Sequence, residues 1–116
     1  MTAAVKKLHL DAAPVDQNIS RAFDLLGTRW TGPVISVLLQ GPCGFSALHR
    51  AVPGISQRML SNRLAALVDA GVVVREVHAG PPLRVAYQVT EAGAALDAPL
   101  RKLSQWAGKH LRSAQA

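Results

Sequence analysis

Two side chains suited to reading DNA, Arg58 and Asn62, lie four positions apart in this 116-residue sequence. In the major groove, arginine pairs with guanine and asparagine with adenine, because each can make two hydrogen bonds to a base edge. Ser61 and Ala65 fall on the same side of a helix and are small enough to allow close approach to a surface. No acid interrupts this side. The set indicates either a DNA-reading surface or a solvated helix face.

One helix from about Gln57 to Ala70 would position these side chains. Ser56 is a good N-cap after the turn signal Pro53-Gly54, and Gly71 suits the left-handed position that ends many helices. On the opposite side of the helix, apolar residues recur at helical spacing, which predicts a packed face formed by Leu60, Leu64 and Leu67.

A shorter helix is predicted just upstream, over Phe45–Val52, with Ser46 as its cap. Two helices joined by a short turn with glycine form a helix-turn-helix, whose second helix enters the major groove. After it come two β-rich runs, Val72–His78 and Arg84–Thr90, around a proline-rich loop. This order predicts a mainly α fold with a small β-hairpin wing, the winged helix-turn-helix.

The charge distribution agrees with a nucleic-acid partner. Thirteen Lys and Arg against seven Asp and Glu give a net charge of +6, and no acid occurs from Leu25 to Val68. Such a basic segment is expected to bind phosphates, chiefly through Arg50 on the first helix and Arg75 and Arg84 on the wing. No stretch is apolar enough to cross a membrane, so double-stranded DNA is the expected partner rather than a membrane.

An enzyme is the rival class, and the residues argue against it. The four histidines are too far apart for a helical metal pair, no glycine-rich phosphate loop is present and the acids form no paired cluster. We therefore expect no catalytic residues, no metal and no cofactor.

The single cysteine, Cys43, excludes intramolecular disulfides and a cysteine-based zinc site. It fits a reducing compartment, and no secretory signal follows Lys6-Lys7, which predicts a cytoplasmic, nucleoid-associated protein. Cys43 lies in the loop before the helix-turn-helix, with no clear cation to activate its thiol. It is either an inert loop cysteine or a redox-sensing one.

The chain is long enough for one domain, predicted over residues 16–112, between a tail at 1–15 and a disordered end at 113–116. The tail is either a flexible end or an arm that docks on a partner subunit. A first helix is expected over about 16–26 and ends at Gly27. The next helix is apolar on nearly all sides and should be the central buried element; either Thr28 or Thr31 could cap it.

The last helix should begin at Thr90, which caps it, and bend at Pro99. Its apolar stripe extends beyond the compact core, which favours a dimer interface, with a core role as the alternative. The residues expected at this interface are Ile19, Phe23, Leu96, Leu100, Leu103, Trp106 and His110. Trp30 and Trp106 near this seam could also enclose an apolar pocket for an effector of unknown identity.

Several motifs together resemble the HxlR family of winged helix-turn-helix regulators, which are MarR-like. They are Gly27-Thr28-Arg29-Trp30-Thr31, Gly41-Pro42, Phe45-Ser46-Ala47-Leu48, Pro53-Gly54-Ile55-Ser56, Leu60-Ser61-Asn62-Arg63-Leu64, Asp69-Ala70-Gly71-Val72-Val73, Arg84-Val85-Ala86-Tyr87 and Thr90-Glu91-Ala92-Gly93. The resemblance covers about Gln17 to His110, with the blocks in the family's order.

The resemblance implies a bacterial or archaeal homodimer, joined through its N- and C-terminal helices, that binds operator DNA and represses or activates a neighbouring gene. Position by position, the residues that match the recognition-helix segment are Ser56, Gln57, Arg58, Ser61, Asn62 and Arg63. Arg75 and Arg84 match basic wing residues, and Trp106 and His110 match the Trp and nearby His of the terminal helix.

The sequence departs from the family at two positions. Many relatives carry a cysteine at the start of the first helix, which senses quinones, aldehydes or oxidants in some branches; that position is Gln17 here. The Glu usual before the wing tyrosine is Ala86. The sequence therefore predicts a sequence-specific DNA-binding regulator on a pseudo-palindromic operator. The alternatives are a winged-helix protein-interaction module and an effector-sensing regulator with a pocket at the dimer seam.

Overall fold

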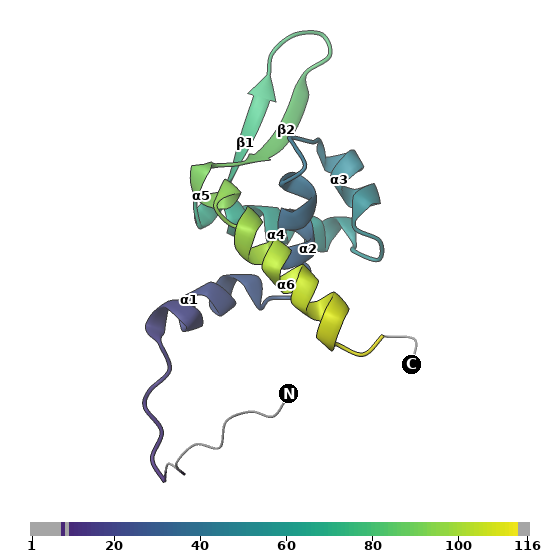
Figure 1. Cartoon of the computed structure of the whole chain (residues 1–116). Coiled ribbons are helices and arrows are strands. Elements are labelled where there is room, and N and C mark those ends of the chain that lie inside the picture. Colours follow the sequence, from purple (N-terminus) through teal and green to yellow (C-terminus); the bar gives the residue numbers. More distant parts are fainter. Residues whose placement is uncertain (1–7, 9, 114–116) are drawn as a thin grey trace.

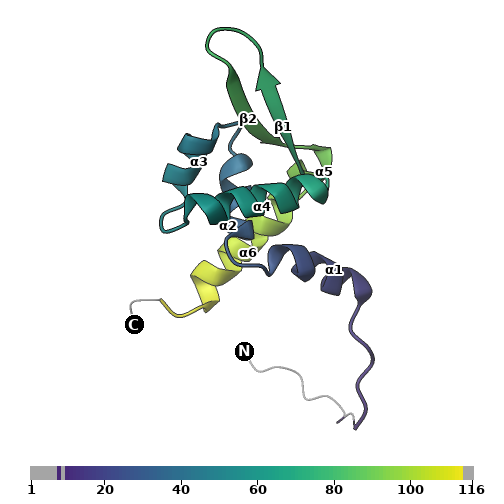
Figure 2. The ribbon, with the colours of Figure 1, turned by 180° about the vertical axis from the view of Figure 1, so that it is seen from behind.

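The computed structural model describes residue 8 and residues 10–113, so most of the predicted tail and end lie outside the described residues. The order of elements is α1 (Gln17–Leu26), α2 (Thr31–Leu38), α3 (Phe45–Ala51), α4 (Gln57–Asp69), β1 (Val73–His78), β2 (Arg84–Val89), α5 (Glu91–Ala94) and α6 (Asp97–His110). The hairpin projects from one end of the molecule, and α1 and α6 lie towards the other (Figures 1 and 2).

The central helix is α2, as the sequence predicts. Val34, Ile35 and Leu38 are fully buried in the core cluster. Neither threonine caps this helix: Trp30 precedes it in a left-handed conformation, with φ of 79°, and makes no side-chain cap. Thr28 instead donates its hydroxyl to the carbonyl of Asp24 at the end of α1, at 3.4 Å.

The helix-turn-helix consists of α3 and α4, and both lie where the sequence places them. The Oγ of Ser56 accepts a hydrogen bond from the backbone N–H of Met59 at 3.0 Å, so the predicted cap of α4 is confirmed. Gly71 adopts a φ of 79° after the helix, as predicted. The predicted cap of α3 is wrong, because Gly44, two residues before Ser46, stands at the N-cap position and Ser46 lies inside the helix.

The wing is an antiparallel hairpin in which Val73 pairs with Val89 at its base and His78 with Arg84 towards its tip. Cys43 extends this sheet. Its backbone N–H donates to the Tyr87 carbonyl at 3.0 Å, and the Tyr87 N–H donates to the Cys43 carbonyl at 2.9 Å. The loop before α3 is thereby fixed to the wing, and the winged helix predicted from the sequence is confirmed.

The C-terminal region differs from the single bent helix that we expected. Thr90 caps only α5, through a bond from the Gly93 N–H, and α6 starts separately at Asp97. Gly93 is buried so close to the carbonyl of Val72 that any side chain would overlap this oxygen. Pro99 falls in the first turn of α6, where proline is tolerated, so the break precedes it.

Candidate nucleic-acid interface

The outer face of α4 carries the residues predicted to read DNA. Gln57, Arg58, Ser61 and Asn62 are exposed, and their side chains make no hydrogen bond or ion pair within the described part of the chain. Leu60, Leu64 and Leu67 on the inner face are fully buried, as predicted. The helix therefore presents a guanidinium, an amide and a hydroxyl to solvent from a rigidly packed support.

Arg63 differs from these neighbours, although it lies on the same helix. It is half-buried, and its Nε donates to the carbonyl oxygen of Arg29 at 2.9 Å, across 34 positions of sequence. The Arg29 guanidinium lies 4.6 Å from the centre of the Trp30 ring, which is a cation–π distance. Arg63 thus ties α4 to the loop between α1 and α2, and its contact with DNA stays a prediction.

The three arginines predicted to hold phosphates are all exposed but do not form one cluster. Arg50 on α3 and Arg84 on β2 line the same open groove. Arg75 pairs across the strands with Tyr87, and these two line a separate hollow beside Ser61 of α4. The cations therefore flank the recognition helix and the wing on different sides. His78, which lines the groove with Arg84, was not singled out by the sequence patterns.

The residues predicted for the dimer interface divide into two groups. Ile19, Phe23, Leu103 and Trp106 are 51%, 57%, 48% and 52% exposed, and His110 is also exposed. Leu96 and Leu100 are half-buried and pack against the core of their own chain. Both helices that carry the exposed group lie at the end away from the wing (Figure 1). The interface itself stays a prediction.

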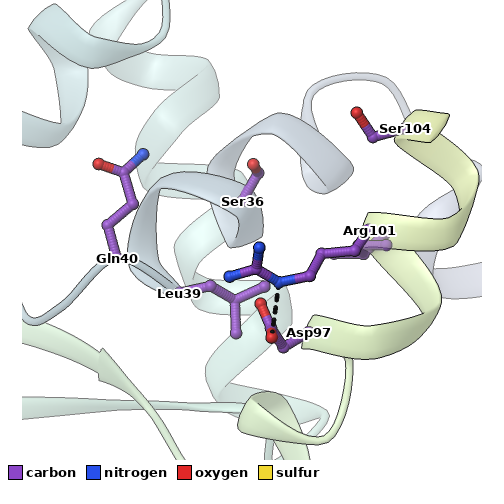
Figure 3. A pocket seen from close by; sticks show the side chains of 7 residues that line it. Ser36, Leu39, Gln40, Asp97, Arg101 and Ser104 are labelled. Carbon is purple, nitrogen blue, oxygen red and sulfur yellow. Dashed lines mark hydrogen bonds and ion pairs between the residues drawn. The ribbon is translucent and has the colours of Figure 1, made fainter. Parts of the chain in front are cut away.

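The two tryptophans predicted to line an effector pocket have different surroundings. Trp30 packs against the core and against the turn at Gly54, where a Cβ would lie 3.2 Å from its ring, whereas Trp106 is half exposed. Neither lines the hollow of about 280 Å³ between α2 and α6. Figure 3 shows that hollow, with Arg101 donating to Asp97 at 2.9 Å. An effector pocket at the seam stays a prediction.

The comparisons with known proteins agree with this geometry. The HxlR-like helix-turn-helix family matches residues 25–115. The chain belongs to this family. Membership makes it a DNA-binding transcriptional regulator, in agreement with the sequence prediction and with the free outer face of α4.

Individual relatives show how far the similarity extends. The HTH-type transcriptional regulator YodB of Bacillus subtilis is 43% identical over 86 residues, which cover 74% of this chain and 77% of YodB. The structure of reduced YodB superposes with a TM-score of 0.77, covering 85% of this chain and 97% of the other at 37% identity. Reduced HypR, a redox regulator, gives a TM-score of 0.74 at 30% identity, covering 79% and 91%.

The single thiol of this HxlR-like chain is poorly suited to rapid oxidation. Cys43 is half-buried, and burial raises the pKa of its thiol above the ordinary value. A thiol with a raised pKa stays protonated at neutral pH and is a weak nucleophile. The geometry therefore favours the inert alternative for Cys43 over a redox-sensing one.

Residues 8 and 10–113 contain no group of three or more His, Cys, Asp or Glu placed to hold a metal ion. Within the same part of this regulator, no helix is both long and apolar enough to cross a bilayer.

Proposed function

We propose that this HxlR-like regulator acts as a homodimer that binds a pseudo-palindromic operator and represses or activates a neighbouring gene. The observation that carries the proposal is the division of α4 into two faces. Its leucines are fully buried, while Arg58 and Asn62 point outward with no partner in the described chain. A helix held this rigidly can present side chains to base edges without reordering.

In this proposal Arg58 and Asn62 read base edges, flanked by Gln57 and Ser61. Each good bidentate contact is worth roughly 1–3 kcal/mol of discrimination against the wrong base. Arg50, Arg75 and Arg84 contact phosphates, which fixes the register of the protein on DNA without reading sequence. Ser56 already uses its hydroxyl to cap α4, so we assign it a supporting role.

Support for a homodimer lies at the end of the molecule away from the wing. The exposed apolar side chains of α1 and α6 would be costly in a lone subunit and are suited to a second copy. Two-fold symmetry would place two recognition helices in successive major grooves, about 34 Å apart. This spacing is the reason to expect an operator with two inverted half-sites.

Selection of bound sequences from random DNA tests the proposal directly. We expect an inverted repeat whose half-sites are centred about one helical turn, roughly 10 base pairs, apart. Enrichment of one unrepeated half-site would contradict the homodimer on DNA. Absence of any enrichment, with binding insensitive to salt, would favour the alternative of a protein-interaction module, because phosphate contacts make DNA binding strongly salt-dependent.

Effector sensing is proposed as an addition to DNA binding. One solved structure of YodB is a quinone-bound form, 38% identical to this chain with a TM-score of 0.71. This chain has Gln17 at the start of α1 and a half-buried Cys43 whose thiol pKa is raised by burial, so a ligand held without a covalent bond fits it better than a thiol adduct. A saturable change in tryptophan fluorescence on adding a quinone would support such a site at the seam.

A further inference from the structure

A wide groove runs between α3 and the wing. Its volume is about 1080 Å³, whereas the hollow between α2 and α6 and the hollow between α4 and the wing each measure about 280 Å³. One wall comes from residues 42–47 and Arg50, and the other from His78 and residues 84–86. The groove therefore joins the first helix of the helix-turn-helix to the outer part of the hairpin.

The charges along this groove are all of one sign. Arg50, His78 and Arg84 line it, and none of its lining residues is acidic. By contrast, Asp69 lines the hollow beside α4 and Asp97 the hollow beside α6. Both arginines of the groove are exposed and have no ion pair or hydrogen bond within the described chain. The groove thus presents uncompensated positive charge, which is complementary to an anion.

The register of the wing places the histidine among these cations. His78 pairs directly with Arg84 across the hairpin, and both are exposed. From α3, Arg50 lines the same groove, while the Nε2 of His49 donates to the Ile55 carbonyl oxygen, 2.8 Å away, and His49 does not line the groove. Glu76, two residues before His78 on β1, lies on the same side of the hairpin and pairs with the groove residue Ala86, but it does not itself line the groove. The charged groups that line the groove together with His78 are therefore the two arginines.

We infer that this groove holds the phosphodiester backbone of bound DNA, and that His78, when protonated, is a third phosphate contact beside Arg50 and Arg84. The inference rests on the proposed DNA binding and extends it. A backbone strand is the anion that fits, because the groove is open and lies between the first helix of the helix-turn-helix and the wing, two elements of the DNA-binding fold. The uncharged imidazole offers less to a phosphate than the imidazolium.

A phosphate contact through His78 should make DNA binding depend on pH. Imidazole changes its charge between about pH 5 and 8. Phosphates in the groove would attract a positive charge on His78. The complex therefore binds more protons than the free protein, and the affinity for DNA should rise as the pH falls. Replacing His78 should remove that part of the pH dependence.

The test uses the full chain and a fluorescein-labelled 30-base-pair duplex of random sequence, since phosphate contacts do not depend on sequence. Fluorescence anisotropy at pH 6 and pH 8 compares wild type with His78→Gln and His78→Arg. At pH 6 we expect His78→Gln to bind about two- to fivefold more weakly than wild type, the strength of one exposed charge pair. At pH 8 we expect His78→Arg to bind more tightly than wild type by a similar factor.

Two control variants compare the loss of a positive charge outside the groove with the loss of one inside it. Lys102→Gln removes a positive charge from α6 and should leave both affinities close to wild type. Arg50→Gln, on the opposite wall, should weaken binding at both pH values and reduce the salt slope by about 0.9. Any other titrating group acts on all variants alike and cancels in the comparison.

Two outcomes distinguish this inference from the function on which it rests. If wild type binds the duplex while both His78 variants match it at both pH values, or Arg50→Gln keeps the wild-type salt slope, the groove assignment is overturned and DNA binding stands. If wild type fails to bind at either pH in dilute salt, the proposed function itself is wrong.

Discussion

Helices α4 and α6 show the same amphipathic pattern in sequence but have opposite surroundings in the structure. The three leucines of α4 are fully buried in its own chain, and Arg58, Ser61 and Asn62 are exposed on its outer face. No residue of α6 is fully buried, and Leu103 and Trp106 remain about half exposed. The exposed side chains of α4 are thus mainly polar or basic and suit DNA, whereas those of α6 include large apolar residues and suit a protein partner.

The two surfaces should differ in how strongly salt weakens their binding. A charged, uncompensated surface binds through phosphate contacts and weakens steeply with salt, whereas an apolar surface associates by burying area and depends little on salt. The wing end and the α1/α6 end of this molecule should therefore respond to different perturbations.

The largest expected effect is at the apolar end. Phe23→Asp combined with Leu103→Asp would place four carboxylates in the seam of a dimer, and we expect the dissociation constant to rise on the order of a thousandfold, from ~4 kcal/mol of lost contact and buried charge. Sedimentation equilibrium measures it. Leu100 is a poorer target, because it packs against its own core.

A matched control sharpens this experiment. Gln105→Asp adds a charge to an exposed position on a different side of α6 and should leave the dimer intact. If the double variant sediments like wild type, the dimer interface does not involve these residues. The exposed apolar surface of α6 would then not be a site of self-association.

The next effect tests the two faces of α4. Leu64→Ala should lower the free energy of unfolding by about 2–5 kcal/mol, because it opens a cavity in the core. Asn62→Ala, two residues away on the outer face, should change it by less than about 0.5 kcal/mol. Urea titration followed by circular dichroism measures both. Equal losses would show that the outer face also supports the fold.

A smaller effect separates base reading from phosphate binding. Arg58→Ala should reduce the preference for a selected operator over random DNA by about 1–3 kcal/mol. Arg84→Ala should weaken binding to both duplexes alike and lower the salt slope by about 0.9. Anisotropy titrations over a range of salt concentrations distinguish the two. An unchanged specificity ratio in Arg58→Ala would mean that another surface reads the sequence.

Much of the fold follows from local patterns. Ser56 as a cap, Gly71 as a terminator and the leucine spacing define α4, and a proline-rich loop between two β-rich runs defines the wing. The misplaced caps of α2 and α3 show the limit of this reasoning. Thr28 or Thr31 could have capped α2, and Ser46 α3, but Trp30 and Gly44 stand at the two N-cap positions. Thr31 is buried inside α2 and Cys43 pairs with β2, so contacts with distant segments bear on where each helix begins.

The sequence by itself determined the order of elements, the polar and apolar faces of α4 and the acid-free basic segment, because caps, helical period and charge are properties of neighbouring residues. Only the tertiary structure decided that Arg63 bonds to the Arg29 carbonyl, that the terminal helix splits at Leu96 and that Arg50 faces His78 and Arg84 across one groove. These contacts depend on how distant segments pack together, and no local pattern encodes that geometry.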